Sequence, residues 1–377
     1  MYQTPKAILP KFLWILILEY LPIANIYKLD IVNKHFDDIL NDDDWKQRFL
    51  YKRSSDIAIV KCSVNRMDHF WKYAYGCYIT CGDFSDISTS IEIDNKANAS
   101  KLIYYKVFIK AGTYNPTKTF RDSHYTNYSI EIIGCKNNPC IINYIDSMPG
   151  FWVISSHYFS IKYIVFSDNN NDMFDFCGAS GYNSNYPNIS KLHLSNCTFK
   201  NNIGQWLCIR KLYDVCVSNC IFESYLLRLF DINKLRITGC TFSASAIAVY
   251  HQYPSENNYI ISHNVFYDLS INELFNFDNG YANTSLINIA NNSISNADIL
   301  CTISSRIKVI FRNNIITNIK SCIGRVCNEQ VNEFVFDSNI FTNVEKLNHT
   351  TYNYCQGKLY SNNTFNNCGN ELTQYIE

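Results

Sequence analysis

Few side chains in this chain of 377 residues stand at spacings that could support catalysis. Hydrolysis of a polysaccharide by general acid catalysis needs a pair of carboxylates. Of the motifs that accompany such a pair in polysaccharide-cleaving sites, the chain has only an Arg-x-Lys tripeptide, Arg306-Ile307-Lys308. Asp168 and Asp172 flank three asparagines and offer oxygen ligands to a cation. The Gly and Glu that complete a calcium-binding loop do not follow these aspartates, so the segment is interpreted as a solvated loop. The sequence therefore predicts no enzyme active site.

The cysteines and histidines are the side chains that could bind a metal ion or act in nucleophilic catalysis. Closely spaced cysteines are Cys77 with Cys81, Cys135 with Cys140, and Cys322 with Cys327. None forms a CxxC pair or has a histidine at zinc-finger spacing. The candidate bases His193, His251 and His263 have no nucleophile or carboxylate at motif spacing. We expect no metal site and no cofactor.

Composition and charge restrict the possible partners. Lys and Arg total 33, as do Asp and Glu, and no basic cluster is present, so a nucleic-acid partner is not expected. The apolar run Phe12 to Leu18 is too short to span a bilayer and lacks a cleavage site after it. Sixteen cysteines without an export signal indicate free thiols. We predict a cytoplasmic or nuclear location, in a host cell if the source is viral, and no membrane partner.

An eight-residue template recurs from Leu192 to the end of the chain: apolar, any, apolar, any, Asn-like, small, any, aromatic or Ile. Its sixth positions lie 20 to 28 residues apart, which suits one turn of a β-solenoid better than a propeller blade of about 40 residues. The copies are LHLSNCTF, VCVSNCIF, LRITGCTF, YIISHNVF, INIANNSI, VIFRNNII, FVFDSNIF and KLYSNNTF, with FSIKYIVF around Ile164 as an earlier copy.

Each copy is interpreted as a strand, a sharp corner and a second strand. Alternating apolar residues mark a strand with one buried face, and Asn tolerates the left-handed conformation that a corner requires. Stacked copies form a parallel β-helix in which like side chains form columns. One column is expected to hold Asn264, Asn292, Asn314, Asn339 and Asn363, preceded by Cys197, Cys220 and Cys240. Another is expected to hold Phe199, Phe222, Phe242 and Phe266.

Residues 8–50 consist of short apolar segments interrupted by Pro10, Pro22 and Asp42-Asp43-Asp44. Leu13, Ile17, Leu18 and Leu21 fall at helical spacing on one face. A unit of this size cannot bury all its apolar side chains by itself, so several are expected to face a partner. The pattern predicts a small all-α domain.

Both regions resemble known families. Residues 1–50 resemble an F-box, through Leu9, Pro10, Leu13, Ile17, Leu18, Tyr20, Leu21, Leu29, Val32, Lys34, Phe36 and Trp45. Phe12 departs from this pattern, because the family usually has an acidic residue there. Residues 101–115 and 128–142 resemble the opening turns of pectin-lyase-like β-helices. The expected fold is mainly β: a small all-α F-box domain (1–50), a linker or cap (51–99) and a right-handed parallel β-helix (100–377).

The F-box resemblance implies a non-catalytic adaptor of a ubiquitin ligase. In that family the F-box binds a Skp1-type linker protein, and through it a cullin-RING ligase, while the second domain binds an unknown substrate protein. The resemblance places the linker contact on Leu9, Pro10, Leu13, Ile17, Leu18, Leu21 and Val32. The alternative is a carbohydrate-binding or carbohydrate-active β-helix with a helical N-terminal cap.

Substrate binding is expected where the repeat leaves side chains free. The template uses its inward positions for the core, so specificity must come from outward positions and from loops of variable length. The intervals between copies are longest between Cys240 and Asn292, and aromatic residues gather there. Exposed aromatics are common interface anchors. We predict that Tyr250, Tyr253 and Tyr281 line the substrate-binding surface.

Overall fold

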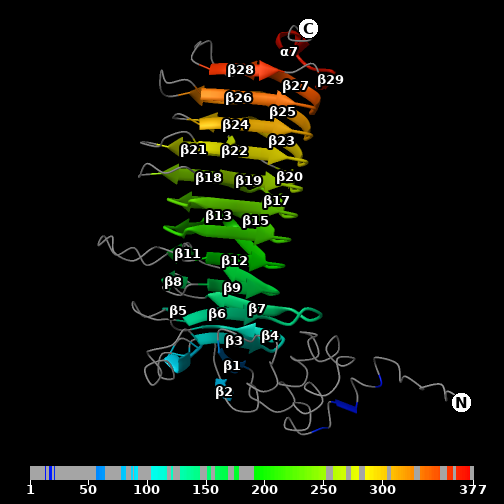
Figure 1. Ribbon diagram of the computed structural model, residues 1–377. Coiled ribbons are helices and arrows are strands. Elements are labelled where there is room, and N and C mark those ends of the chain that lie inside the picture. Colours follow the sequence, from blue (N-terminus) through cyan, green and yellow to red (C-terminus); the bar gives the residue numbers. More distant parts are fainter. Residues whose placement is uncertain are drawn as a thin grey trace, which may run out of the picture.

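The protein is a parallel β-solenoid whose turns stack into a column (Figure 1). The computed structural model describes Leu13, Ile17, Leu18 and Leu21, and then the following residues: 57–63, 78–81, 86–87, 89–91, 103–116, 120–121, 128–144, 151–153, 158–168, 174–177, 191–251, 258–268, 273–279, 285–303, 307–326, 332–348, 355–359 and 362–373. Within these residues the chain is mainly β, as predicted.

Sheet A has 13 strands, and from β3 onward neighbouring strands run parallel. Its strands, in spatial order, are β2 (Tyr78–Cys81), β1 (Ile57–Ser63), β3 (Ile103–Ile109), β6 (Tyr128–Ile133), β9 (Tyr158–Lys162), β12 (Lys191–Ser195), β14 (Asp214–Ser218), β16 (Lys234–Thr238), β19 (Asn258–Ser262), β22 (Ser285–Ala290), β24 (Ile307–Arg312), β26 (Asn332–Asp337) and β28 (Cys355–Leu359).

Sheet B has 14 strands and covers the rest of the solenoid wall. Its main path is β29 (Thr364–Asn366), β27 (Ile340–Asn348), β25 (Ile315–Val326), β23 (Ser293–Ile303), β20 (Val265–Tyr267), β17 (Thr241–Ser243), β15 (Ile221–Phe230), β13 (Thr198–Arg210), β10 (Ile164–Asp168), β7 (Cys140–Tyr144) and β4 (Gly112–Tyr114). Beside it lie β11 (Phe174–Cys177), β18 (Ala246–His251) and β21 (Glu273–Asn279), while β5 (Phe120–Arg121) and β8 (Phe151–Val153) form a separate pair.

Sheet B bends around a corner, so the solenoid has three faces. The first part of β15 pairs with β17, and its second part pairs with β18. The first and second parts of β23 pair with β20 and β21 in the same way. Sheet A is therefore face 1, the first segment of sheet B is face 2, and the second segment is face 3.

The corner between faces 1 and 2 confirms the predicted role of the Asn-containing template. The residue at the fifth template position adopts a left-handed backbone, with φ values of 53° at Asn196 and Asn219, 56° at Asn291 and 55° at Asn313. Gly239 takes a φ of 66° at the same position, which a glycine adopts without a Cβ clash. The fold thus places the flexible residue at the corner and turns the sixth residue inward.

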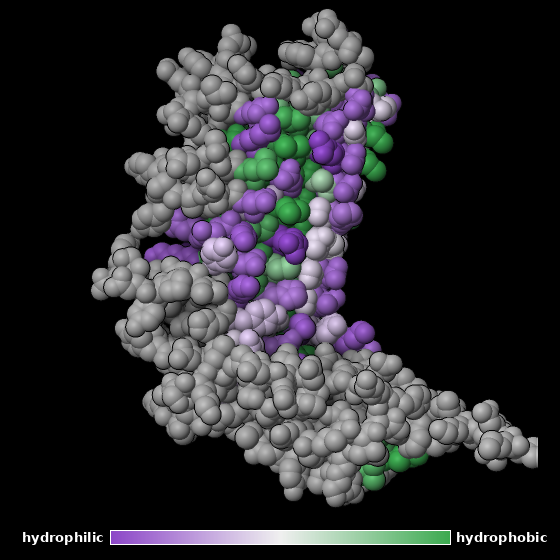
Figure 2. Space-filling view, in the orientation of Figure 1, coloured by the Kyte–Doolittle hydropathy of each residue, from purple (hydrophilic) through white to green (hydrophobic). Residues whose placement is uncertain are grey.

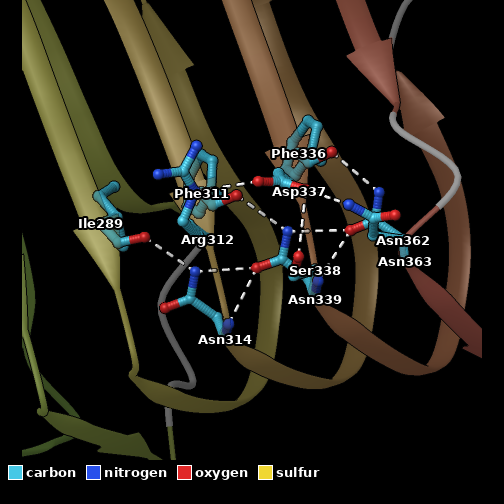
Figure 3. A network of polar contacts seen from close by, with 10 residues as sticks. All are labelled: Ile289, Phe311, Arg312, Asn314, Phe336, Asp337, Ser338, Asn339, Asn362 and Asn363. Atoms are coloured by element: carbon cyan, nitrogen blue, oxygen red, sulfur yellow. Dashed lines mark hydrogen bonds and ion pairs between the residues drawn. The ribbon is translucent and has the colours of Figure 1, made fainter.

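The sixth residues form the predicted asparagine column, called here the inner ladder (Figure 3). Asn314 donates from Nδ2 to the Ile289 carbonyl at 2.8 Å and to Asn339 Oδ1 at 3.0 Å. Its own Oδ1 accepts hydrogen bonds from the backbone N and the Nδ2 of Asn292, at 2.9 and 3.0 Å. Similar contacts connect Asn264 to Asn363. The amide side chains therefore satisfy backbone groups that the corner would otherwise leave unpaired.

Cysteines continue this column toward the N-terminus, also as predicted. The Cys240 backbone N donates to Asn264 Oδ1 at 2.8 Å, and Cys240 Sγ in turn accepts from the Cys220 backbone N at 3.4 Å. A thiol is a weaker hydrogen-bonding group than an amide. The chain therefore replaces a polar ladder by a more apolar one in these turns.

The predicted phenylalanine column lies inside face 2. Phe222 stacks between Phe199 and Phe242, with ring centroids 5.1 and 4.7 Å apart, and Phe242 stacks on Phe266 at 4.7 Å. Phe166, from the expected earlier copy around Ile164, extends the column at 5.0 Å from Phe199. All these side chains are buried, which confirms the assigned register.

The ends of the solenoid have their own contacts. β1 pairs antiparallel with β3 and with β2, so described parts of the segment expected to be a linker or cap extend sheet A. At the other end, α7 (Asn370–Thr373) packs near β27 and buries Leu372. These segments cover or extend strand edges that would otherwise remain open to pairing.

The expected all-α domain is described at four residues. Leu13, Ile17 and Leu18 are helical, and the Leu21 backbone N donates to the Leu18 carbonyl at 3.2 Å. Leu18 is fully buried, whereas Ile17 is 42% exposed. The other expected F-box positions lie outside the described residues.

Candidate functional site

Face 2 carries a continuous surface without charged side chains, called here the uncharged face. It comprises the outward residues of six successive turns, paired in register from β17 to β29. Its members are Thr241, Ser243, Val265, Tyr267, Ser293, Ser295, Ile315, Thr317, Ile340, Thr342, Thr364 and Asn366.

The uncharged face exposes much of the apolar surface of the described chain. Val265 is 44% exposed, Ile315 50% and Ile340 42%. Tyr267 is also exposed, and Ile221 extends the same outward column by one turn. Single exposed apolar residues are ordinary, but a contiguous patch of them is typical of an interaction site. Rigid, flat stacking at about 4.7–4.9 Å per turn favours a partner that is itself extended or flat.

Charged side chains mark the N-terminal boundary of this surface. Lys200 and Glu223 occupy the outward positions of the preceding turns and form an ion pair at 3.7 Å. The face could have been found in the sequence, because its first column is the seventh template position: Thr, Ile, Thr, Val, Ser, Ile, Ile, Thr. The repeat template leaves that position open to any residue, so the predicted substrate-binding residues lie in the longer intervals between copies instead.

A second asparagine ladder borders the uncharged face on its other side. Asn318 donates to Asn296 Oδ1 at 2.9 Å and accepts from Asn343 Nδ2 at 2.9 Å, and Asn367 continues the series at 2.7 Å. These residues are exposed and left-handed, with φ values of 53° to 62°. This outer ladder connects successive turns at the corner between faces 2 and 3.

Face 3 carries the second candidate surface, the Arg–Trp patch, formed by Trp206, Leu226, Arg228, Phe230 and Tyr250. The guanidinium carbon of Arg228 lies 3.3 Å from the centre of the Trp206 ring. The Phe230 and Tyr250 rings stack at 4.9 Å with an angle of 18°. Trp206 is 43% exposed, and the other four side chains are half-buried. The patch joins apolar anchors to a cation.

The predicted substrate residues divide between described and undescribed parts of the chain. Tyr250 is half-buried and lies at an outward position of β18, within the Arg–Trp patch. Tyr253 and Tyr281 lie outside the described residues, as do Leu9, Pro10 and Val32 of the predicted linker contact. Trp206, Arg228 and Phe230 were missed because they come from earlier turns, where the intervals between copies are short.

Face 1 shows a different distribution of side chains. Its central outward column includes Ile260, Ile310 and Val335, separated by polar residues such as Asn288. Figure 2 shows a narrow hydrophobic stripe along the molecule, bordered on both sides by hydrophilic side chains. Arg312 and Asp337 pair at 3.0 Å on the same sheet (Figure 3). Face 1 thus carries ion-paired charges beside its apolar residues, whereas the outward column of face 2 alternates apolar residues with small uncharged ones, as in Val265, Ser293 and Ile315.

A polar cluster occupies the N-terminal part of face 1. Glu131 lies between Lys162 at 2.6 Å and Lys106 at 3.2 Å. Burial alone would raise the pKa of Glu131, but the two ammonium groups outweigh it and hold this pKa below its ordinary value. The Glu131 carboxylate is therefore ionised at neutral pH and pairs with the two lysines. It is therefore a poor general acid at neutral pH.

His193 contacts two other side chains, although the sequence places no nucleophile or carboxylate at motif spacing from it. Its Nδ1 lies 3.3 Å from the Tyr158 hydroxyl, and its Nε2 lies 3.3 Å from Ser218 Oγ. Burial, followed by the nearby Lys162, lowers the pKa of His193, so the ring is neutral at physiological pH. A Ser–His pair without a carboxylate on the far ring nitrogen lacks the group that orients a catalytic triad. These contacts suit a structural role.

The other chemical candidates do not converge on a reaction centre in the described chain. Lys308 of the Arg-x-Lys tripeptide pairs with Glu333 at 3.0 Å, while Arg306 and Asp172 lie outside the described residues. Within the described ranges, no group of three His, Cys, Asp or Glu side chains could hold a metal ion. No helix in the same ranges is long and apolar enough to cross a membrane.

The ten cysteines whose side chains the structure describes are free thiols. Burial raises the pKa of Cys140 to about 12 and that of Cys208 to about 11. A thiol with so high a pKa is almost entirely protonated at neutral pH and is a weak nucleophile. These cysteines act as small apolar side chains of the core.

The fold defines the chain as a protein of the parallel β-solenoid class, and two of its three faces carry candidate surfaces. No family model, no curated protein and no solved structure matches the chain. Its function must therefore be inferred from the surfaces themselves.

Proposed function

We propose that the protein is a non-catalytic substrate-recognition adaptor of an SCF-type ubiquitin ligase. Its N-terminal F-box binds a Skp1-type linker protein, which connects it to a cullin-RING ligase. Its right-handed β-helix, similar to pectin-lyase-like proteins, binds the protein to be ubiquitinated. The ligase and its conjugating enzyme supply the chemistry, so the adaptor needs no active site and no cofactor.

The uncharged face is the observation that carries this proposal. Its exposed side chains are mainly β-branched and lie on strands, so they lose little rotational freedom when a partner covers them. A rigid scaffold with an exposed apolar surface suits protein binding better than catalysis, which needs converging polar groups. Ile315 and Ile340 lie side by side in register near its middle, and we expect them to be central anchors.

The helical residues near the N-terminus support the linker contact. Leu18 is fully buried and its neighbour Ile17 is 42% exposed. A helix that buries one apolar side chain and presents the next to solvent can bind a partner without losing its own packing. We therefore assign Ile17 to the linker contact. Leu18 stays among the predicted contacts, but because it is fully buried its substitution would not separate binding from folding.

Isothermal titration calorimetry with a purified Skp1-type linker protein tests the proposal. Ile17→Asp should weaken binding at least tenfold, because it places a charge without a partner in an apolar interface. Ile340→Asp, an equally exposed isoleucine on the solenoid, is the matched control and should bind the linker like the parent. Leu18→Asp is not suitable, since it would disrupt the module itself.

The second half of the test concerns substrate capture. Ile315→Asp combined with Ile340→Asp should reduce the ubiquitinated proteins recovered from cells under proteasome inhibition, while linker binding remains unchanged. Failure of the parent chain to bind any Skp1-type protein would refute the adaptor function. Binding to oligosaccharides instead would favour the carbohydrate-binding alternative.

The proposed location is cytoplasmic or nuclear, where the ubiquitin ligases act. Free thiols at the ten cysteines whose side chains are described are compatible with a reducing compartment. Fluorescence microscopy of the tagged chain tests this assignment, and accumulation in the secretory pathway would contradict it.

A further inference from the structure

The Arg–Trp patch contains an arginine that has no carboxylate partner among the residues that the structure describes. Arg228 lies over the Trp206 ring at 3.3 Å, a cation–π contact that holds the guanidinium in one orientation. Its Nε is buried and has no hydrogen-bond partner in the part of the chain that the structure describes. The ion pairs found among the same residues do not involve Arg228.

A half-buried guanidinium without a hydrogen-bond acceptor lowers the stability of the fold unless a bound partner supplies an acceptor. Removing an arginine N–H from water without an acceptor is destabilising, and the penalty is largest for charged groups. A carboxylate is the best-matched external acceptor for a guanidinium, because its two oxygens fit the planar fork of N–H donors. Partial burial also strengthens this interaction relative to one in bulk water. The buried Nε is closed to solvent, so an external carboxylate would pair with the two Nη groups at the outer end of the guanidinium, which are not among the buried unpaired atoms.

Apolar groups surround the arginine and define what accompanies that carboxylate. Leu226 is the register partner of Trp206, and Phe230 follows Arg228 by two residues on the same strand. Tyr250, stacked on Phe230, extends the surface to the next turn. Aromatic side chains next to an arginine are typical of energetically important positions in protein interfaces.

We propose that the Arg–Trp patch binds an acidic segment of the captured protein, in which an Asp or Glu carboxylate pairs with Arg228 while a neighbouring apolar side chain packs on Trp206 and the Phe230–Tyr250 pair. This inference rests on the proposed adaptor function for the identity of the bound protein. It specifies the substrate class that the second surface selects.

A nucleic acid would fit the patch less well. A phosphate backbone is followed by a row of cations, whereas the outward neighbours of Arg228 in its own column are Cys208 and Ala248. Ala248 is followed by Asn276 in the next turn. Arg210, the register partner of Phe230, adds one further cation at the edge of the patch. Two cations set among aromatic and aliphatic side chains favour carboxylates beside apolar residues over a continuous phosphate backbone.

Fluorescence anisotropy with the full chain tests the proposal. The probe is the fluorescein-labelled peptide Gly-Ser-Leu-Glu-Leu-Glu-Gly-Ser, compared with the same peptide carrying Gln for Glu. The Glu peptide should bind about tenfold or more tightly than the Gln peptide, as expected for a charge-assisted hydrogen bond. Its affinity should also fall as salt is added.

Variants at the patch make the test specific. Arg228→Gln should remove the preference for the Glu peptide, and Trp206→Ala should weaken binding of both peptides. Arg236→Gln is the matched control, because Arg236 is exposed on face 1 and should not contribute. Arg228→Lys keeps the charge but loses the planar fork, so it should retain only part of the preference.

Equal binding of the Glu and Gln peptides, or an Arg228→Gln variant that keeps the preference, would overturn the proposal. Tighter, Arg228-dependent binding of a single-stranded oligothymidylate would overturn it in favour of nucleic acid. Neither peptide measurement involves the linker protein. Loss of linker binding in the titration would therefore refute the adaptor function and leave the acidic specificity of the patch standing.

Discussion

The inner ladder predicts a large and position-specific loss of stability for Asn314→Ala. The substitution removes the acceptor of the Asn292 backbone N at 2.9 Å and a donor to the Ile289 carbonyl at 2.8 Å. Asn339 Oδ1 keeps its second donor, the Asn314 backbone N, at 2.9 Å. Two buried backbone groups thus become unpaired. At about 1–3 kcal/mol each, the expected loss is about 2–6 kcal/mol.

Two control variants come from the chain itself. Asn314→Cys installs the side chain that the N-terminal turns use at this position, where Cys240 Sγ accepts from the Cys220 backbone N at 3.4 Å. It should cost about 1–2 kcal/mol, because sulfur makes weaker hydrogen bonds. Asn318→Gly removes a member of the exposed outer ladder at a φ of 55°, which glycine adopts freely. It should cost less than about 1 kcal/mol, since water replaces the lost contacts.

Urea denaturation followed by circular dichroism measures these differences, and hydrogen exchange at the Asn292 amide locates them. The exchange measurement is needed because a solenoid can lose turns one after another instead of unfolding in a single step. A loss below about 1 kcal/mol for Asn314→Ala, or one no larger than that for Asn318→Gly, would refute the reasoning that the ladder satisfies buried backbone groups.

Three further predictions follow from the core and its titratable groups. Phe222→Ala should destabilise the chain by about 3–5 kcal/mol in the same urea assay, because it opens a cavity between two stacked rings; a change below about 1 kcal/mol would mean that the column is not packed as described. The lowered pKa values of Glu131 and His193 mean that the folded state disfavours protonation of both groups, so stability present above their ordinary values of 4.5 and 6.5 should be lost on acidification. His193→Gln should therefore reduce the fall in urea midpoint between about pH 7.5 and about pH 5.5, and an identical fall in the parent would contradict this assignment. Cys140 and Cys322, whose pKa values are raised by burial, should react with iodoacetamide far more slowly in native protein than in urea, as measured by mass spectrometry; equal rates would show that these thiols are accessible.

The sequence by itself determined the repeat and therefore the fold class. Alternation at the first and third template positions identified the strands, and the spacing of Cys240, Asn264 and Asn292 set the length of a turn. Because stacking places equivalent residues above one another, the Asn and Phe columns could be assigned before any coordinates were known. In these residues the local backbone preference and the long-range packing favour the same structure, so the sequence pattern was sufficient to predict it.

Only the tertiary structure decided which outward residues form surfaces. Trp206 and Arg228 lie 22 positions apart in the chain and share no local motif, yet stacking of adjacent turns brings the guanidinium over the ring. Val265 and Ile315 look like ordinary strand residues until the register places them in one exposed column without charges. The physical reason is that outward positions are not constrained by the core. Their contacts depend on which turns become neighbours, and that information lies in the stacking of the turns.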